Sequence, residues 1–174
     1  STNTDSVIAN PNTTTVYTVE AYSNDGCPGS TTVTITVNPL PSVLSGPTNA
    51  SCNGLCDGQA NASGATTYIW SPGGATTATI TNLCAGIFTV TGTDLNGCVN
   101  TSTCVVTQPA ALNVSFPFVY NVTCHGLTDG VVTAQPSGGI PGYTYFWMPS
   151  GTTQDTAFNL SEGTQTVTVT DANS

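Results

Sequence analysis

The chain contains the run Cys52-Asn53-Gly54-Leu55-Cys56-Asp57-Gly58 and repeats it 72 positions later as Cys124-His125-Gly126-Leu127-Thr128-Asp129-Gly130. A second matching pair of runs begins at Asn82-Leu83 and Asn159-Leu160, now 77 positions apart. The difference of five residues is a loop insertion near residues 138–142. A register that holds over so many positions with one insertion indicates an internal repeat rather than a shared composition.

The composition excludes several classes of partner. The 174 residues include no Lys or Arg and nine acidic residues, for a formal charge of −9. Nucleic acids are bound through cationic side chains, so no nucleic-acid partner is expected, and anionic membrane surfaces are disfavoured for the same reason. No apolar run reaches the ~18 to 20 residues of a membrane span, so no membrane insertion is expected. The absence of an initiator Met and a signal peptide favours a mature or excised piece.

Short alternating runs of apolar and β-branched residues predict strands and essentially no long helix. Strands are expected at residues 16–21, 32–37, 42–44, 58–62, 67–71, 78–81, 86–94, 102–107, 112–118, 131–135, 144–148, 156–158 and 165–171. Such strands in modules of 71 to 77 residues predict an all-β protein of tandem Ig-like antiparallel β-sandwich modules, the first and last incomplete. The predicted domains are the C-terminal part of an Ig-like module (1–41), a complete repeat (42–109) and a second repeat lacking its last strand (110–174).

The first of these domains is predicted to be a hairpin. Two alternating runs flank Asn24-Asp25-Gly26-Cys27, a turn signal between strands. The matched positions Tyr17/Phe88, Val19/Val90, Gly26/Gly97 and Cys27/Cys98 share an offset of 71. The run Asn38-Pro39-Leu40-Pro41 then predicts a stiff linker, because Pro fixes φ.

The repeats resemble the SprB-type repeat of large surface adhesins in gliding Bacteroidetes. Its pattern is Cys-x-Gly-x-x-Asp-Gly, then Gly-Gly-x-x-Pro-Tyr-x-Tyr-x-Trp, then Asn-Leu-x-x-Gly leading to Asp-x-Asn-Gly-Cys. Residues 124–173 match it with Gly142 in place of Pro and Gln165 near the usual aromatic, and residues 52–98 match with a shorter loop and two added cysteines. Residues 10–41 resemble the end of related Ig-like modules. The resemblance implies a β-sandwich, secretion and an extracellular cell-surface role, and it carries over no catalytic residue.

The seven cysteines favour an oxidising, extracellular setting. We expect disulfides between Cys52 and Cys98 across the complete module and between Cys56 and Cys84, which are unique to this repeat. A zinc site at Cys52 and Cys56 is the alternative. Zinc needs four ligands and no second close cysteine pair exists, so no metal is expected.

The aspartates at the repeat ends have two interpretations. Asp57, Asp94, Asp129 and Asp171 could ligate calcium, which takes six to eight oxygen ligands. Turn chemistry explains Asp and Asn at these positions equally well.

The aromatic runs leave a functional alternative open. Tyr68 precedes Trp70, and Tyr143 and Tyr145 precede Trp147, each at a spacing of two residues on one strand face. Exposed, these rings would form a sugar-stacking platform, and the protein would be a carbohydrate-binding module with glycans as partners. Buried, they would form the core strand of an Ig-like sandwich, which we favour.

No enzyme activity and no cofactor are expected. A Ser-His-Asp system would need His125, the single histidine, whose counterpart in the sister repeat is Asn53. The Bacteroidetes resemblance also implies O-glycosylation at Ser6 and Thr156, because Asp5-Ser6-Val7 and Asp155-Thr156-Ala157 match the Asp-Ser/Thr-apolar pattern.

Together these patterns predict a structural or adhesive repeat module of an extracellular bacterial surface protein or filament. Its partners would be copies of itself or neighbouring repeats of the same protein. Incomplete sandwiches leave apolar grooves and strand edges, so we expect head-to-tail association through the N-terminal hairpin and the third module. An intermolecular disulfide between Cys27 and Cys124 is the sharpest form of this expectation.

Overall fold

The computed structural model describes residues 6–173, and all of their regular structure is β. The strands are β1 Thr15–Tyr22, β2 Pro28–Ile35, β3 Leu44–Thr48, β4 Gly58–Ser63, β5 Thr67–Ser71, β6 Thr79–Leu83, β7 Gly86–Thr93, β8 Val99–Val106, β9 Asn113–Tyr120, β10 Gly130–Ser137, β11 Thr144–Met148, β12 Thr156–Leu160 and β13 Thr166–Thr170. Every pairing between them is antiparallel. The prediction of an all-β chain of antiparallel sandwich modules is confirmed for the described residues.

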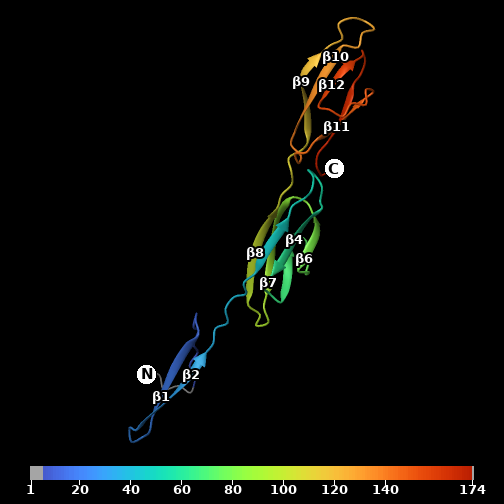
Figure 1. Ribbon diagram of the computed structural model, residues 1–174. Helices are drawn as coiled ribbons and strands as arrows, with labels where there is room; N and C mark the ends of the chain where they lie inside the picture. Colours follow the sequence, from blue (N-terminus) through green and yellow to red (C-terminus); the bar gives the residue numbers. More distant parts are fainter. Residues whose placement is uncertain (1–5, 174) are drawn as a thin grey trace.

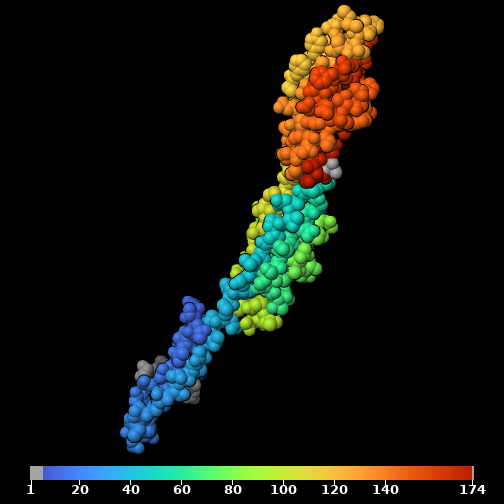
Figure 2. Space-filling view, in the orientation of Figure 1, coloured from blue at the N-terminus to red at the C-terminus, as the bar shows by residue number. Residues whose placement is uncertain are grey.

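The strands form three groups that follow one another along a rod (Figure 1). We name them the hairpin segment (β1 and β2), the middle module (β3 to β8) and the outer module (β9 to β13). No ladder in the described part of the chain joins strands of different groups. The space-filling view shows a thin hairpin segment and a narrow neck before the middle module (Figure 2). The predicted domain boundaries at residues 41/42 and 109/110 stay predictions.

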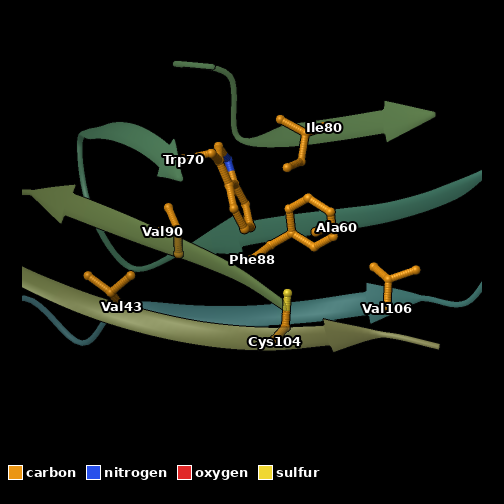
Figure 3. Close-up of a cluster of buried hydrophobic side chains, with 8 residues drawn as sticks. All are labelled: Val43, Ala60, Trp70, Ile80, Phe88, Val90, Cys104 and Val106. Atoms are coloured by element: carbon orange, nitrogen blue, oxygen red, sulfur yellow. The ribbon is translucent and has the colours of Figure 1, made fainter. Parts of the chain in front are cut away.

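The middle module is a sandwich of two three-stranded sheets, β3-β4-β6 and β5-β7-β8. Alternate residues of each strand face inward, so that one face of each sheet is apolar. The two sheets meet over the indole of Trp70, which lies between Val90 and Ile80 in Figure 3. The eight buried members of this core are Val43, Ala60, Trp70, Ile80, Phe88, Val90, Cys104 and Val106.

Strands β3 and β8 lie side by side at one edge of this sandwich and run in the same direction (Figure 3). The Oγ atoms of Ser45 and Ser102 are 2.8 Å apart, and the Ala50 N–H donates to the Thr107 carbonyl at 2.9 Å. These contacts close the edge between the two sheets without a continuous ladder.

The outer module repeats this plan with five strands, in sheets β9-β10-β12 and β11-β13. Trp147 occupies the place of Trp70, and each indole is 1% exposed. Each indole N–H donates at 3.0 Å to a backbone carbonyl seven residues later, that of Thr77 or Gln154. The repeat therefore preserves the packing of the tryptophan as well as its sequence.

The repeated Asn-Leu run has a backbone explanation. Asn82 and Asn159 adopt φ of 57° and 56°, a left-handed conformation that Asn tolerates better than most residues. Each interrupts the register of its ladder, at the bulge between β4 and β6 or between β10 and β12. The following leucine is then directed toward the core.

The hairpin segment has the register of β7 and β8 without the rest of a sandwich. Tyr17 pairs with Val33, as Phe88 pairs with Cys104 in the middle module. Val19 and Val33 are 54% and 51% exposed, because no second sheet among the described residues covers them.

Several strand ends differ from those expected. β3 covers residues 44–48 rather than 42–44, and it includes Pro47, which a strand paired on only one side tolerates. β8 begins at Val99 and β2 at Pro28, because both ladders continue to the turn.

Candidate functional site at the module junction

One predicted disulfide is present in the middle module. Cys56 and Cys84 are bonded, with Cα atoms 3.8 Å apart. They flank the paired residues Gly58 and Leu83, so the bond fastens the end of the β4–β6 ladder.

The predicted bond between Cys52 and Cys98 is absent, and both residues are free cysteines. Cys98 directly precedes β8, whereas Cys52 lies beyond its other end, next to Gly54, whose N–H donates to Gln108. Eight strand residues at roughly 3.3 Å each separate the two ends by about 25 Å. The prediction was wrong because the repeat gives each cysteine an equivalent in a neighbouring module, Cys124 for Cys52 and Cys27 for Cys98. It does not show that Cys52 and Cys98 lie at the same end of one module.

The loop that carries Cys52 has a fixed internal structure, which the outer module repeats. The Ser51 N–H donates to Asp57 at 2.9 Å, and the Leu55 N–H donates to the Cys52 carbonyl at 3.2 Å. At the outer end, Thr123 donates to Asp129 and Leu127 to Cys124 in the same pattern, at 3.0 and 3.1 Å. We call these two loops, residues 51–57 and 123–129, the end loops.

Hydrogen bonds hold the pKa of both end-loop aspartates below its ordinary value. The main cause is the hydroxyl of Ser51 on Asp57 and of Thr123 on Asp129, followed by the N–H groups of the same residues. Each carboxylate thus has both oxygens engaged within its own loop.

The turns at the opposite ends of the modules are also built alike. Asp94 Oδ1 accepts from the N–H groups of Asn96 and Cys98, at 2.8 and 2.9 Å, and Asp171 Oδ1 accepts from Asn173 at 3.0 Å. In the hairpin segment, residues 23–27 close the equivalent turn through the Ser23 N–H and the Cys27 carbonyl at 3.0 Å. We call these segments the end turns, at residues 23–27, 94–98 and 171–173.

These contacts favour the turn interpretation of the four aspartates over the calcium interpretation. Each carboxylate organises its own loop or turn, and the described residues contain no group of three or more His, Cys, Asp or Glu side chains that could hold a metal ion.

An end turn contacts an end loop where the middle and outer modules meet. The Asn173 amide donates to the Ser51 carbonyl at 2.7 Å, and Cys52 Sγ lies 3.9 Å from the Asn173 carbonyl oxygen. The Asn53 amide donates to the Pro109 carbonyl at 3.0 Å, which fastens the same loop to the connection between the modules. A small open hollow beside this contact is lined by Cys52, Asn53, Ala110, Leu112, Gly139, Val169, Thr170 and Asp171.

The remaining predicted cysteines occupy the two ends of the rod. Cys27 is exposed in the end turn of the hairpin segment, and Cys124 is exposed in the end loop of the outer module. Figure 1 places these two segments at opposite extremities. Cys104 is buried in the core of the middle module, which its position on the inward face of β8 explains.

The aromatic pairs belong to the interior. Trp70 and Trp147 are enclosed by their sandwiches, and Tyr68 binds back to Ala65 through its hydroxyl. Burial is the main cause that raises the pKa of Tyr145. The indoles therefore present no face on which a sugar could stack, and glycan binding stays a prediction without a platform at these residues.

The outer module has an open groove of about 580 Å³ at its far end. The groove is lined by Val119 to His125, Gly130 to Val132, Leu160 to Gly163 and Gln165. In the middle module this space is filled, since a Cβ on Gly58 would lie 2.7 Å from Val106 of β8. The groove thus corresponds to the place that β8 occupies in the middle module.

His125 lies at the rim of this groove with its side chain 88% exposed and Nδ1 3.4 Å from Glu162 Oε1. It has no contact with a serine hydroxyl that could act as a nucleophile in the described residues. A solvated surface histidine is the simplest description.

The two predicted glycosylation sites have different surroundings. Ser6 is exposed, and its pattern includes Asp5, which lies outside the described residues. Thr156 lies within β12, half-buried, with its hydroxyl 3.0 Å from that of Thr133. A glycan at Thr156 would have to displace this contact. Both sites stay predictions.

Sequence reasoning missed the contact between Asn173 and the end loop. The signal was available, because Asn173 corresponds to Asn96 at an offset of 77, and a turn residue kept at the tip of each module suggests an external contact. It did not say which surface the turn meets.

The arrangement defines a tandem β-sandwich protein whose modules meet end to end. Residues 118–152 match the family model described as SprB repeat, so the chain carries a repeat of this type. The SprB repeat is a structural repeat family rather than an enzyme family, and such repeats occur in cell-surface proteins. No curated protein matches the chain. No described helix is long and apolar enough to cross a membrane.

Proposed function

We propose that the chain is a structural and adhesive segment of an extracellular surface protein, in which β-sandwich modules associate head to tail. The observation that carries this proposal is the contact of the end turn at Asn173 with the end loop at Ser51 and Cys52. The match to the SprB repeat supports a surface role. The resemblance to adhesins of gliding Bacteroidetes supports its adhesive part.

The two extremities of the rod are complementary halves of that junction. The outer module ends in the loop 123–129, which has the hydrogen bonds of the loop 51–57. The hairpin segment ends in the turn 23–27, which corresponds to the turn 94–98. A second copy can therefore place its end turn on the free end loop as residues 171–173 lie on residues 51–57.

Such a contact joins different surfaces of the two copies, so it produces open filaments rather than closed dimers. It brings Cys27 of one copy toward Cys124 of the next. Asp25 stands where the inner junction has Asn173, and a carboxylate cannot donate to the carbonyl of Thr123. The contact between copies is consequently weaker than the inner junction, and a disulfide would secure it.

The test uses the whole chain at increasing concentration, before and after treatment with oxidised glutathione. We expect electron microscopy to show rods joined end to end, and non-reducing electrophoresis to show a ladder of covalent oligomers. Cys27→Ser and Cys124→Ser should each remove the ladder, whereas Cys104→Ser is the matched control because its thiol is buried. Asp25→Asn should lower the concentration needed for assembly, since it restores the amide donor.

Monomers at all concentrations, in light scattering and in micrographs, would contradict the proposal. A ladder that persists in Cys27→Ser, or oligomers joined side by side, would contradict the assigned surfaces.

A further inference from the structure

We infer that the outward face of the sheet β9-β10-β12 binds carbohydrate, with the rings of Phe118, Tyr120 and Phe158 stacked against successive units of a neutral oligosaccharide. We call this surface the aromatic face. It deepens the adhesive part of the proposed function, because it gives that part a class of ligand. Binding there does not depend on association between copies, since all three rings belong to one sheet of one module.

The outward direction of these side chains follows from the alternation along the strands. Ala134 and Ala157 are buried in the core of the outer module, so their neighbours on β10 and β12 point away from it. Thr133 and Thr156 are two of these neighbours, and their hydroxyl oxygens are 3.0 Å apart. Phe118 pairs with Thr133 and therefore lies on the same outward face.

Tyr120 and Phe158 form the next row of the aromatic face. Tyr120 pairs with Val131 of β10 on one side, and the bulge of the β10–β12 ladder sets Phe158 and Asn159 opposite Val131 on the other. With strands about 4.8 Å apart, the backbones at Tyr120 and Phe158 are separated by roughly 10 Å, and Phe118 lies about 7 Å from Tyr120 along β9. Phe118, Tyr120 and Phe158 are 53%, 48% and 60% exposed. The three rings thus spread over the whole width of the sheet and are open to a ligand.

The same face of the middle module has no ring at these positions. The counterparts of the three aromatic residues are Gly46, Thr48 and Thr81, at offsets of 72, 72 and 77. Gly46 and Thr48 pair with residues of β4 as Phe118 and Tyr120 pair with residues of β10, so the positions are equivalent in structure as well as in sequence. The fold of the repeat therefore does not require aromatic side chains here, and packing of the core does not explain them.

Charge and extent decide the class of ligand. None of the residues of β9, β10 and β12 is charged, and the chain has a charge of −9 without a cation, so an anionic polymer would be repelled. Three strands of five to eight residues present a face on the order of 300 Å². A stable protein interface buries about 800 Å² on each partner. The face is therefore too small to hold a second copy by itself, and it fits a narrow uncharged ligand.

The aromatic face also has the mixed chemistry that a sugar requires. A neutral sugar ring has an apolar side of C–H groups, which packs on an aromatic ring, and hydroxyl groups at its rim. The hydroxyls of Thr133 and Thr156 lie in the row of Phe118, and the bond between them uses one of their two hydrogens. The other hydrogen and the remaining lone pairs can bond sugar hydroxyls.

The experiment uses the full chain with Cys27→Ser, so that sugar binding is measured apart from covalent assembly. The protein is applied to an array of neutral oligosaccharides of glucose, mannose, galactose, xylose and N-acetylglucosamine, and the tightest-bound member is titrated by calorimetry. We expect this oligosaccharide to bind more tightly than its single sugar unit. Tyr120→Thr and Phe158→Thr introduce the residues of the middle module, and each should lower the affinity roughly 3- to 10-fold.

Phe146→Thr is the matched control, because its ring is similarly exposed but belongs to the other sheet, β11-β13. This variant should bind as tightly as the chain without it. An unchanged fluorescence spectrum of the two buried tryptophans checks that each variant stays folded.

No binding to any member of the array would overturn the inference. Affinity that is unchanged in both Tyr120→Thr and Phe158→Thr, or that falls equally in Phe146→Thr, would also overturn it. Self-association that is lost in Tyr120→Thr would assign the face to a second copy instead of a sugar. Filaments of the unaltered chain without sugar binding would contradict only this inference, and sugar binding without filaments would contradict only the proposed head-to-tail association.

Discussion

The middle and outer modules are two versions of one repeat, and their cores differ in size. The middle module buries eight residues, whereas the outer module buries four, Ala134, Trp147, Ala157 and Leu160. Both keep the buried tryptophan with its bond to a backbone carbonyl. The tryptophan is therefore the buried residue that both cores keep in identity and in its hydrogen bond, whereas the other core positions hold different residues or differ in burial.

Three local differences explain why the core of the outer module is smaller than that of the middle module. β8 supplies Cys104 and Val106 to the middle core, and the outer sheet β11-β13 has no such neighbour among the described strands. Only the middle module has a disulfide. Gln165 takes the place of Phe88, and its Oε1 is buried without a partner.

The largest expected effect comes from replacing the tryptophans. Trp70→Ala should destabilise the middle module by about 3 to 5 kcal/mol, as is usual for a buried aromatic residue. Trp147→Ala should unfold the outer module altogether, because two alanines and one leucine remain in its buried core. Each variant keeps one tryptophan, whose fluorescence during denaturation reports on the unaltered module, while amide exchange reports on the altered one. Native-level protection of the backbone amides of β10 to β13 from exchange in Trp147→Ala would contradict the expectation that the outer module unfolds.

The next largest effect should come from removing the Cys56–Cys84 disulfide, which only the middle module contains. The double variant Cys56→Ser/Cys84→Ser should lose about 2 to 4 kcal/mol, because the unfolded chain is no longer closed across 28 residues. In a Trp147→Phe background, Trp70 fluorescence measures the middle module alone. In a Trp70→Phe background, Trp147 fluorescence should show that the outer module unfolds at an unchanged denaturant concentration. An equal shift in both modules would mean that they unfold together.

The smallest effect should be a gain in the outer module. Gln165→Phe removes an unpaired buried oxygen and restores the aromatic ring found at Phe88, which should stabilise the module by about 1 kcal/mol. Gln165→Leu is the matched control, since it removes the same oxygen without adding a ring. Denaturation followed by Trp147 fluorescence in a Trp70→Phe background measures both. No gain in either variant would show that solvent satisfies this oxygen.

The fold could be predicted from the sequence where side-chain chemistry repeats locally. Alternation located the strands, and the spacing of Trp70 and Trp147 from Asn82 and Asn159 indicated equivalent core strands. The Cys56–Cys84 pair could be predicted because no other repeat has these cysteines.

The candidate site was less accessible to sequence reasoning. The Cys52–Cys98 pairing failed because the direction of each strand decides which end of a sandwich a residue occupies. The contact of Asn173 with Ser51 joins residues 122 positions apart in the sequence, and the repeat does not show which surface the turn meets. The buried oxygen of Gln165 depends on packing that emerges only in three dimensions.

The edge formed by β3 and β8 has a mechanical consequence. The chain enters the middle module at the start of β3 and leaves it at the end of β8. The two strands run in the same direction, so entry and exit lie at opposite ends of this module. A pull along the rod therefore slides one strand past the other. The Ser45–Ser102 and Ala50–Thr107 contacts, with the bond from Asn100 to the Pro41 carbonyl, are loaded simultaneously in shear rather than opened one after another. A tether built from such modules would resist tension through this edge while its two sheets stay packed on Trp70.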